Sequence, residues 1–182
     1  MRRLKPYRRW LLPALIALAL TVEAGCRRSK RPRVETVEED QGPLASVVVF
    51  SDPRTSMQLV RGFYEMEGGA WRWTMGKFTV TLRPPPGSSE KGARLEVKLA
   101  VPEAVIAKIG PVSLSATVGG LALEPQTFSA PGDGVYARDV PASALGGEAA
   151  TFDFALDKYL AAGVVEQREL GIIVSSVGLT TK

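Results

Sequence analysis

The sequence contains no histidine and a single cysteine, Cys26, among its 182 residues. Histidine is the commonest general base and metal ligand, and cysteines supply thiol nucleophiles, zinc ligands and disulfides. The chain also lacks a Gly-x-Ser-x-Gly elbow, a phosphate-binding loop and a Gly-x-Gly-x-x-Gly motif followed by a helix. We therefore predict a protein that is not an enzyme, with no cofactor and no internal disulfide.

Helical periodicity is also scarce, and only residues 101–108 and 142–145 favour a short helix. Apolar and polar residues alternate instead, in runs at residues 77–82, 95–99, 112–118, 152–157 and 172–174. Such alternation is typical of antiparallel strands that bury one face. Turn residues separate the runs, at residues 84–87, 119–120, 131–134 and 146–147. The pattern predicts an all-β domain over residues 45–182, an antiparallel β-sandwich of the jelly-roll or galactose-binding type.

The first 25 residues have the three parts of a signal peptide. Five basic residues within positions 2–9 precede an uncharged, apolar run from Trp10 to Val22, and the small residues Ala24 and Gly25 follow. As a helix, the apolar run would reach about 20 Å, which is short of a hydrocarbon core of about 30 Å. We therefore predict that residues 1–25 are an export signal.

The end of this segment resembles the lipobox of bacterial lipoproteins, in which small residues stand directly before a cysteine. Ala24 and Gly25 precede Cys26, whereas Glu23 occupies a position where the lipobox has an apolar residue. The resemblance implies that Cys26 is acylated, with palmitate among its lipids, and that the exported chain is anchored to a bacterial membrane of the cell envelope. The alternative is an ordinary signal peptide cleaved near Ala24, which leaves Cys26 as a free thiol.

The formal net charge of +4 belongs to the predicted signal peptide. From Cys26 onward, eighteen basic residues are balanced by eighteen acidic ones, so we expect no binding to nucleic acid. Within residues 26–44, a basic segment is followed by an acidic one with few apolar side chains, which is typical of a flexible tether. An alternative role for the basic segment, residues 27–33, is contact with anionic lipid headgroups.

Two of the three tryptophans lie close together, at Trp71 and Trp73. Gly68 and Gly69 precede them and predict a hairpin, in which both tryptophans lie on one face of a strand and Arg72 lies on the other. Aromatic rings can stack on the apolar faces of sugars, with polar groups bonding to the hydroxyls. The alternative is a place in the core, and we expect one tryptophan inside the sandwich and one at its rim.

The candidate ligand-binding residues are Tyr64, Glu65, Trp71, Arg72, Trp73 and Arg168. Arg168 precedes the last apolar run, and we interpret it as a residue that pins a loop, with ligand contact as the alternative. The motifs GFYEME at 62–67, RWT at 72–74 and RELGI at 168–172 resemble bacterial jelly-roll-like modules found beside glycosyltransferases. This resemblance covers about residues 60–180 and implies a setting in glycan chemistry.

Two functions follow from these patterns. The first is a non-catalytic module that binds glycan or another envelope ligand, and the second is a structural or assembly subunit of an envelope protein complex. A hydrolase would need a pair of carboxylates, with Glu65, Glu67, Asp133 and Asp139 as candidates by residue type. Asp133 and Asp139 are also oxygen donors that suit calcium. Because their spacing selects neither role, we predict no catalytic residue and no bound metal.

Overall fold

The computed structural model describes residues 43–182, so the predicted signal peptide, Cys26 and most of the predicted tether lie outside the described residues. The strands are β1 (Val47–Val49), β2 (Leu59–Glu67), β3 (Trp71–Leu82), β4 (Ala93–Val101), β5 (Val112–Val118), β6 (Leu121–Phe128), β7 (Gly132–Val140), β8 (Ala150–Leu156) and β9 (Ile173–Thr181). The helical segments are η1 (Pro53–Gln58), α1 (Ser88–Lys91), α2 (Glu103–Ile109) and η2 (Ala142–Ala144). Over residues 43–182, none of the helices has the length and apolar character needed to cross a membrane.

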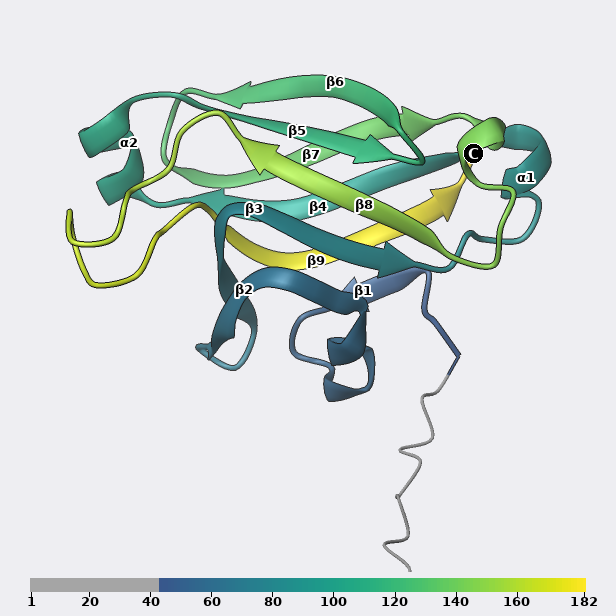
Figure 1. Ribbon diagram of the computed structural model, residues 1–182, viewed down its shortest axis with the longest axis horizontal. Helices are drawn as coiled ribbons and strands as arrows, with labels where there is room; N and C mark the ends of the chain where they lie inside the picture. Colours follow the sequence, from purple (N-terminus) through teal and green to yellow (C-terminus); the bar gives the residue numbers. More distant parts are fainter. Residues whose placement is uncertain (1–42) are drawn as a thin grey trace, which may run out of the picture. The chain divides into compact units, whose positions relative to one another are not determined.

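All strand pairs are antiparallel, in the order β6-β5-β8-β3-β9-β4-β7, with β1 added to β9 and β2 added to β3. The long strand β3 connects two layers. Its first part pairs with β9 at Arg72 and Trp73, and its second part pairs with β8 over residues 77–82. One layer contains β6, β5 and β8, and the other contains β7, β4 and β9 (Figure 1). The predicted all-β antiparallel sandwich is confirmed.

The core lies between the layers because each central strand has one apolar face. In β4, Leu95, Val97 and Leu99 are buried, whereas Lys98 between them is exposed. Phenylalanines join β2, β3 and β8 in the same core, and the rings of the paired residues Phe78 and Phe154 stack with centroids 4.8 Å apart. Burial of a large apolar side chain contributes roughly 1.5–3 kcal/mol, so these alternating runs supply most of the drive for sandwich formation.

Polar side chains close the sandwich on both sides. Arg138 of β7 donates from Nε to the backbone oxygen of Glu124 in β6 at 2.7 Å, which links the two outermost strands. On the opposite side, the buried Gln58 side chain donates to the backbone oxygens of Ala45 and Thr81 at 2.9 and 2.7 Å. It also accepts from the nitrogen of Ala45 at 2.8 Å. The sheet is therefore nearly closed without a continuous backbone ladder.

The short helices at 101–108 and 142–145 are confirmed as α2 and η2. The predicted turn at 131–134 is wrong for its last three residues, because β7 begins at Gly132 and pairs there with the end of β4. Gly134 is needed inside the strand, since a Cβ there would lie 2.8 Å from Cε1 of Phe128. Strands β1, β6 and β7 had not been predicted.

The two ends of the sandwich differ in what they carry. Figure 1 shows α2 and the loop between β8 and β9 at one end, and α1 with the C-terminus at the other. The hairpin turn between β2 and β3 lies at the start of β3, whereas Leu82 ends β3 toward α1. Residues 43–44, where the described chain begins, lie beside Arg83 and Pro84 just beyond Leu82.

Candidate functional site

The predicted hairpin is present, with β2 and β3 joined through residues 68–70. Gly68 and Gly69 have φ of 58° and 67°, a region that favours glycine. Across the hairpin, Trp71 pairs with Glu67. Successive side chains on a strand alternate between faces, so Trp71 and Trp73 share one face of β3 and Arg72 lies on the other, as predicted.

Strand register continues the tryptophan face across the sheet. Trp73 of β3 pairs with Ile173 of β9, Ile173 pairs with Ala100 of β4, and Ala100 pairs with Asp133 of β7. Directly paired residues project to the same side of an antiparallel sheet. These four side chains therefore form one row on the outer face, across four strands.

A second row lies one step along the same strands. Lys98 pairs with Val135 of β7 and with Ser176 of β9, and a register shift beside Lys98 makes room for Ser175. Together the rows define an outer-face area that we call the tryptophan surface. It consists of Trp71, Trp73, Lys98, Ala100, Asp133, Val135, Ile173 and Ser175.

A depression of about 380 Å³ lies at the Lys98 and Asp133 end of the tryptophan surface, and neither Trp71 nor Trp73 is among its lining residues. Its lining includes Lys98, Asp133, Val135 and Ser175. The hydroxyl of Ser175 donates to the backbone oxygen of Lys98 at 3.4 Å, a long contact. Within the described residues, neither the ammonium group of Lys98 nor the carboxylate of Asp133 forms an ion pair. The depression therefore offers one cation and one anion for hydrogen bonds.

Both tryptophans are half-buried, so the expected split between the core and the rim is wrong. Trp71 and Trp73 are two residues apart on one strand, and a strand cannot send such a pair to opposite faces. Trp73 is partly buried and packs against the hydrophobic core. Trp71 leans toward the hairpin turn, where a Cβ on Gly68 would lie 2.9 Å from Nε1 of its indole. Part of each indole remains open to a ligand.

Tyr64, Glu67 and Arg168 are brought together beside the tryptophans. The guanidinium of Arg168 donates from Nη1 to Glu67 at 2.8 Å and from Nε to Glu166, and it lies 5.0 Å from the ring centroid of Tyr64. The hydrogen bonds to Glu166 and Glu67 raise the pKa of Arg168 above its ordinary value. These contacts hold the loop before β9 on β2, which supports the interpretation of Arg168 as a residue that pins a loop.

Arg72 and Glu65 are separated from the tryptophan surface. Arg72 donates from Nη1 to the backbone oxygen of Tyr64 at 3.0 Å, and its Nε is buried with no hydrogen-bond partner among the described residues. A carboxylate oxygen of Glu65 lies 4.0 Å from Nη1 of Arg72, and the Glu65 side chain is fully exposed. The structure therefore gives Arg72 a contact that braces the hairpin.

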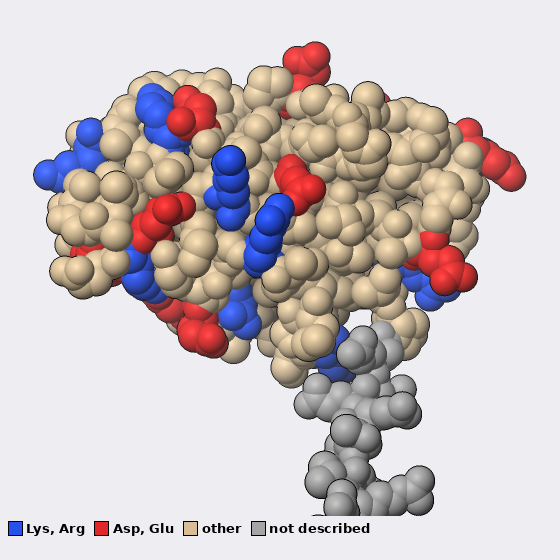
Figure 2. Space-filling model, viewed as in Figure 1, with Lys and Arg blue, Asp and Glu red and all other residues tan. Residues whose placement is uncertain are grey.

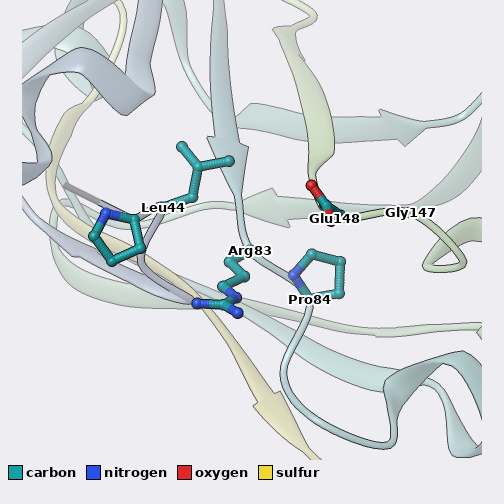
Figure 3. A pocket seen from close by; sticks show the side chains of 6 residues that line it. Leu44, Arg83, Pro84, Gly147 and Glu148 are labelled. Carbon is teal, nitrogen blue, oxygen red and sulfur yellow. The ribbon is translucent and has the colours of Figure 1, made fainter. Parts of the chain in front are cut away.

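A second depression of about 310 Å³ lies near residue 43, at the end of β3 that leads to α1. Figure 3 shows Arg83 and Leu44 along one part of its wall, with Pro84 and Glu148 nearby. The lining contains prolines, glycine and charged groups but no aromatic ring. The tryptophans lie at the opposite end of β3, so this depression is not adjacent to them.

The candidate acidic residues lie in different settings. Asp139 pairs with Lys182 at 3.1 Å and with Arg94 at 3.4 Å, and the hydrogen bond from Lys182 contributes most to lowering its pKa. Glu67 is bound to Arg168, whereas Asp133 lies on the tryptophan surface. Within residues 43–182, no three His, Cys, Asp or Glu side chains are grouped so as to hold a metal ion.

Charged side chains are dispersed over the protein surface that Figure 2 shows, with basic and acidic groups intermingled. No broad area of one sign is visible on that face.

Sequence reasoning found the two tryptophans but missed Lys98, Ala100, Asp133 and Ser175 as their neighbours. The sequence pattern marks Asp133 only as a candidate carboxylate and does not connect it with Trp73. Each of these residues stands at an outward position of an alternating or glycine-rich run. The signal that joins them is the order and register of β3, β9, β4 and β7, which the local pattern does not contain.

The described chain is thus an antiparallel β-sandwich with an aromatic outer sheet face. No family model matches the sequence, and no curated protein matches it. Among solved structures, a mannan-recognising carbohydrate-binding module, TmCBM27, is similar at 14% identity and a TM-score of 0.43, over 76% of this chain and 97% of that one. A CBM4 structure is similar at 9% identity and a TM-score of 0.38, over 75% of this chain and 85% of that one. The GH115 glucuronidase BtGH115A is similar at 10% identity and a TM-score of 0.35, over 62% of this chain and 14% of that one.

Proposed function

We propose that this chain is a lipid-anchored, non-catalytic module that binds glycan in the cell envelope through the tryptophan surface. The observation that carries the proposal is the placement of Trp71 and Trp73 on one outer face, both half-buried and two residues apart. Aromatic rings on an open sheet face give the flat apolar contact that pyranose rings need. Lys98, Asp133 and Ser175 lie on the same face and supply polar contacts for hydroxyl groups.

The binding test uses the full chain in a detergent without a sugar headgroup. Trp10 is first replaced by Phe, so that the remaining indole fluorescence comes from Trp71 and Trp73. Soluble wall and surface polysaccharides are then titrated while the emission is followed. We expect a saturable change with at least one polysaccharide, and its loss in Trp71→Ala and Trp73→Ala. No response to any polysaccharide would contradict the proposal, as would unchanged binding by both variants.

Membrane attachment through acylated Cys26 is the second part of the proposal. The described chain begins at residue 43, beside Arg83, whereas the tryptophans lie at the opposite end of β3. Strand β3 spans residues 71–82, about 35 Å at roughly 3.3 Å per residue. Anchoring on the N-terminal side would therefore leave the tryptophan surface away from the point of attachment.

The anchor is tested in cells grown with labelled palmitate. We expect label on the wild-type chain and recovery of that chain with membranes. Cys26→Ser should lose the label and leave the membrane fraction. Glu23→Leu restores an apolar residue three positions before the cysteine and should label at least as strongly as the wild type. A labelled Cys26→Ser chain would contradict acylation at this position.

A further inference from the structure

We infer that the glycan is an extended, electrically neutral chain that runs across four strands, from the two tryptophans to Asp133. This inference rests on the proposed function and adds the direction, the minimum length and the charge class of the ligand. It is carried by the register of the sheet and by two charges of opposite sign, Lys98 and Asp133, that form no ion pair within residues 43–182.

The direction follows from the row of paired residues. Trp73, Ile173, Ala100 and Asp133 lie in register on β3, β9, β4 and β7. Neighbouring strands are about 4.8 Å apart, so the row spans about 14 Å from its first strand to its last. A disaccharide does not cover that distance. A ligand that touches both the indoles and the carboxylate must therefore contain more than two sugar residues.

The small side chain of Ala100 lies between the two ends of the row. Because Ala100 projects little from the sheet, the outer face is shallow between Ile173 and Asp133, next to the depression at Lys98 and Ser175. A chain of sugar rings can then pass from Ile173 to Asp133 without meeting a large side chain at position 100. The tryptophan surface therefore continues into the depression.

The charge class follows from Lys98 and Asp133. Lys98 pairs with Val135, and Asp133 pairs with Ala100, so the two charges are diagonal neighbours, about 7–8 Å apart at the backbone. A chain with one sign of charge would gain attraction at one of the two groups and lose it through repulsion at the other, whereas a neutral chain meets neither repulsion. Hydroxyl groups can donate to the carboxylate and accept from the ammonium. Nearby Glu67 is already paired with Arg168, which also binds Glu166.

The probes are oligosaccharides of two to six residues, measured by titration calorimetry on the full chain. The neutral series are β-1,4-linked glucose, mannose and N-acetylglucosamine. Oligomannuronate and chitosan oligomers of equal length supply the anionic and cationic comparisons. We expect the affinity for a neutral series to rise with length until the chain has at least four residues. The charged series should bind with an affinity at least about tenfold lower.

Two variants test the far end of the path. Lys98→Met and Asp133→Asn should each weaken hexasaccharide binding about tenfold and leave disaccharide binding unchanged, because a charge-assisted hydrogen bond is lost only by the longer ligand. Glu96→Gln, further along β4 and outside the tryptophan surface, serves as the matched control and should bind like the wild type. The melting temperature of each variant shows that it is folded.

The outcomes separate this inference from the proposed function. Glycan binding that depends on Trp71 but not on ligand length, Lys98 or Asp133 would overturn the extended path and leave the binding module intact. Equal or tighter binding of a charged series would overturn neutrality alone. No binding of any oligosaccharide would overturn both the inference and the proposed function.

Discussion

The outer face of β4 and β7 has two halves that use the same kinds of side chain differently. In the half near the C-terminus, Arg94 and Lys182 both pair with Asp139, at 3.4 and 3.1 Å. In the other half, Lys98 and Asp133 form no ion pair within the described residues. The tryptophans lie beside the second half only. Charges there are available to a ligand, whereas those of the first half are already satisfied.

Register explains the difference. Arg94 lies directly opposite Asp139 on the neighbouring strand, which favours pairing. Lys98 instead lies opposite Val135, and Asp133 lies opposite Ala100. The number of charges on a face therefore says little about ligand binding until their cross-strand partners are known.

The largest effect should come from removing an aromatic ring beside the second half. Trp73→Ala is expected to weaken glycan binding about a hundredfold, since a central aromatic contact contributes more than 2 kcal/mol to recognition. Calorimetry with a neutral hexasaccharide measures the change. Met75→Ala alters the next outward position on β3 and should leave the affinity unchanged. Equal losses in the two variants would break the link between Trp73 and the site.

The second half also depends on a close approach between β3 and the start of β9. A Cβ on Gly171 would lie 2.6 Å from Oγ1 of Thr74 and 2.8 Å from the backbone oxygen of Met75. Gly171→Ala should therefore lower the free energy of unfolding by about 1–3 kcal/mol, as measured by urea denaturation. Gly146→Ala meets no atom within 4 Å and should leave that free energy nearly unchanged. A Gly171→Ala chain as stable as the control would show that the contact is looser than described.

Introducing a cross-strand ion pair into the second half, like the one that the first half contains, should reduce glycan binding. Ala100→Lys places an ammonium group opposite Asp133, which would engage the carboxylate and fill the low part of the surface. We expect hexasaccharide affinity to fall about tenfold, because one charge-assisted hydrogen bond is lost. Ala137→Lys makes the same change opposite Glu96 in the first half and should bind normally. If Ala100→Lys binds like the wild type, the free Asp133 carboxylate has no role.

The smallest effect concerns the ion pairs of the first half. The hydrogen bond from Lys182, with the charge of Arg94, lowers the pKa of Asp139. A lowered folded-state pKa adds stability above the unfolded-state value, and that stability is lost as the pH falls through the folded-state value. Asp139→Asn should therefore lower the melting temperature slightly at pH 7 and converge with the wild type below about pH 3. A difference that grows on acidification would contradict this sign.

Much of the fold could be predicted because alternation of apolar and polar residues indicates which face of a strand is buried. The runs in β3, β4, β5, β8 and β9 each place apolar side chains on one face. Strands β6 and β7 escaped prediction because they contain Pro125 and the glycines at 132 and 134, which favour turns. Pro125 is tolerated because β6 ends the sheet order, where a missing N–H breaks no ladder on the outer side.

The candidate site could be predicted only where it is local. Trp71, Trp73 and Arg72 are neighbours in the sequence, and a single strand fixes their faces. Lys98 and Asp133 come from other strands, and their position beside the tryptophans depends on β9 lying between β3 and β4. That strand order results from long-range pairing, which alternation alone does not specify.

The most direct test follows the backbone amide and indole N–H signals of the full chain by nuclear magnetic resonance while a neutral hexasaccharide is added. We expect shifts at the indoles of Trp71 and Trp73 and at the amides of Lys98 and Asp133, with the signals of Arg94 and Asp139 unchanged. Shifts confined to Arg94 and Asp139, or no shifts at saturating ligand, would contradict it.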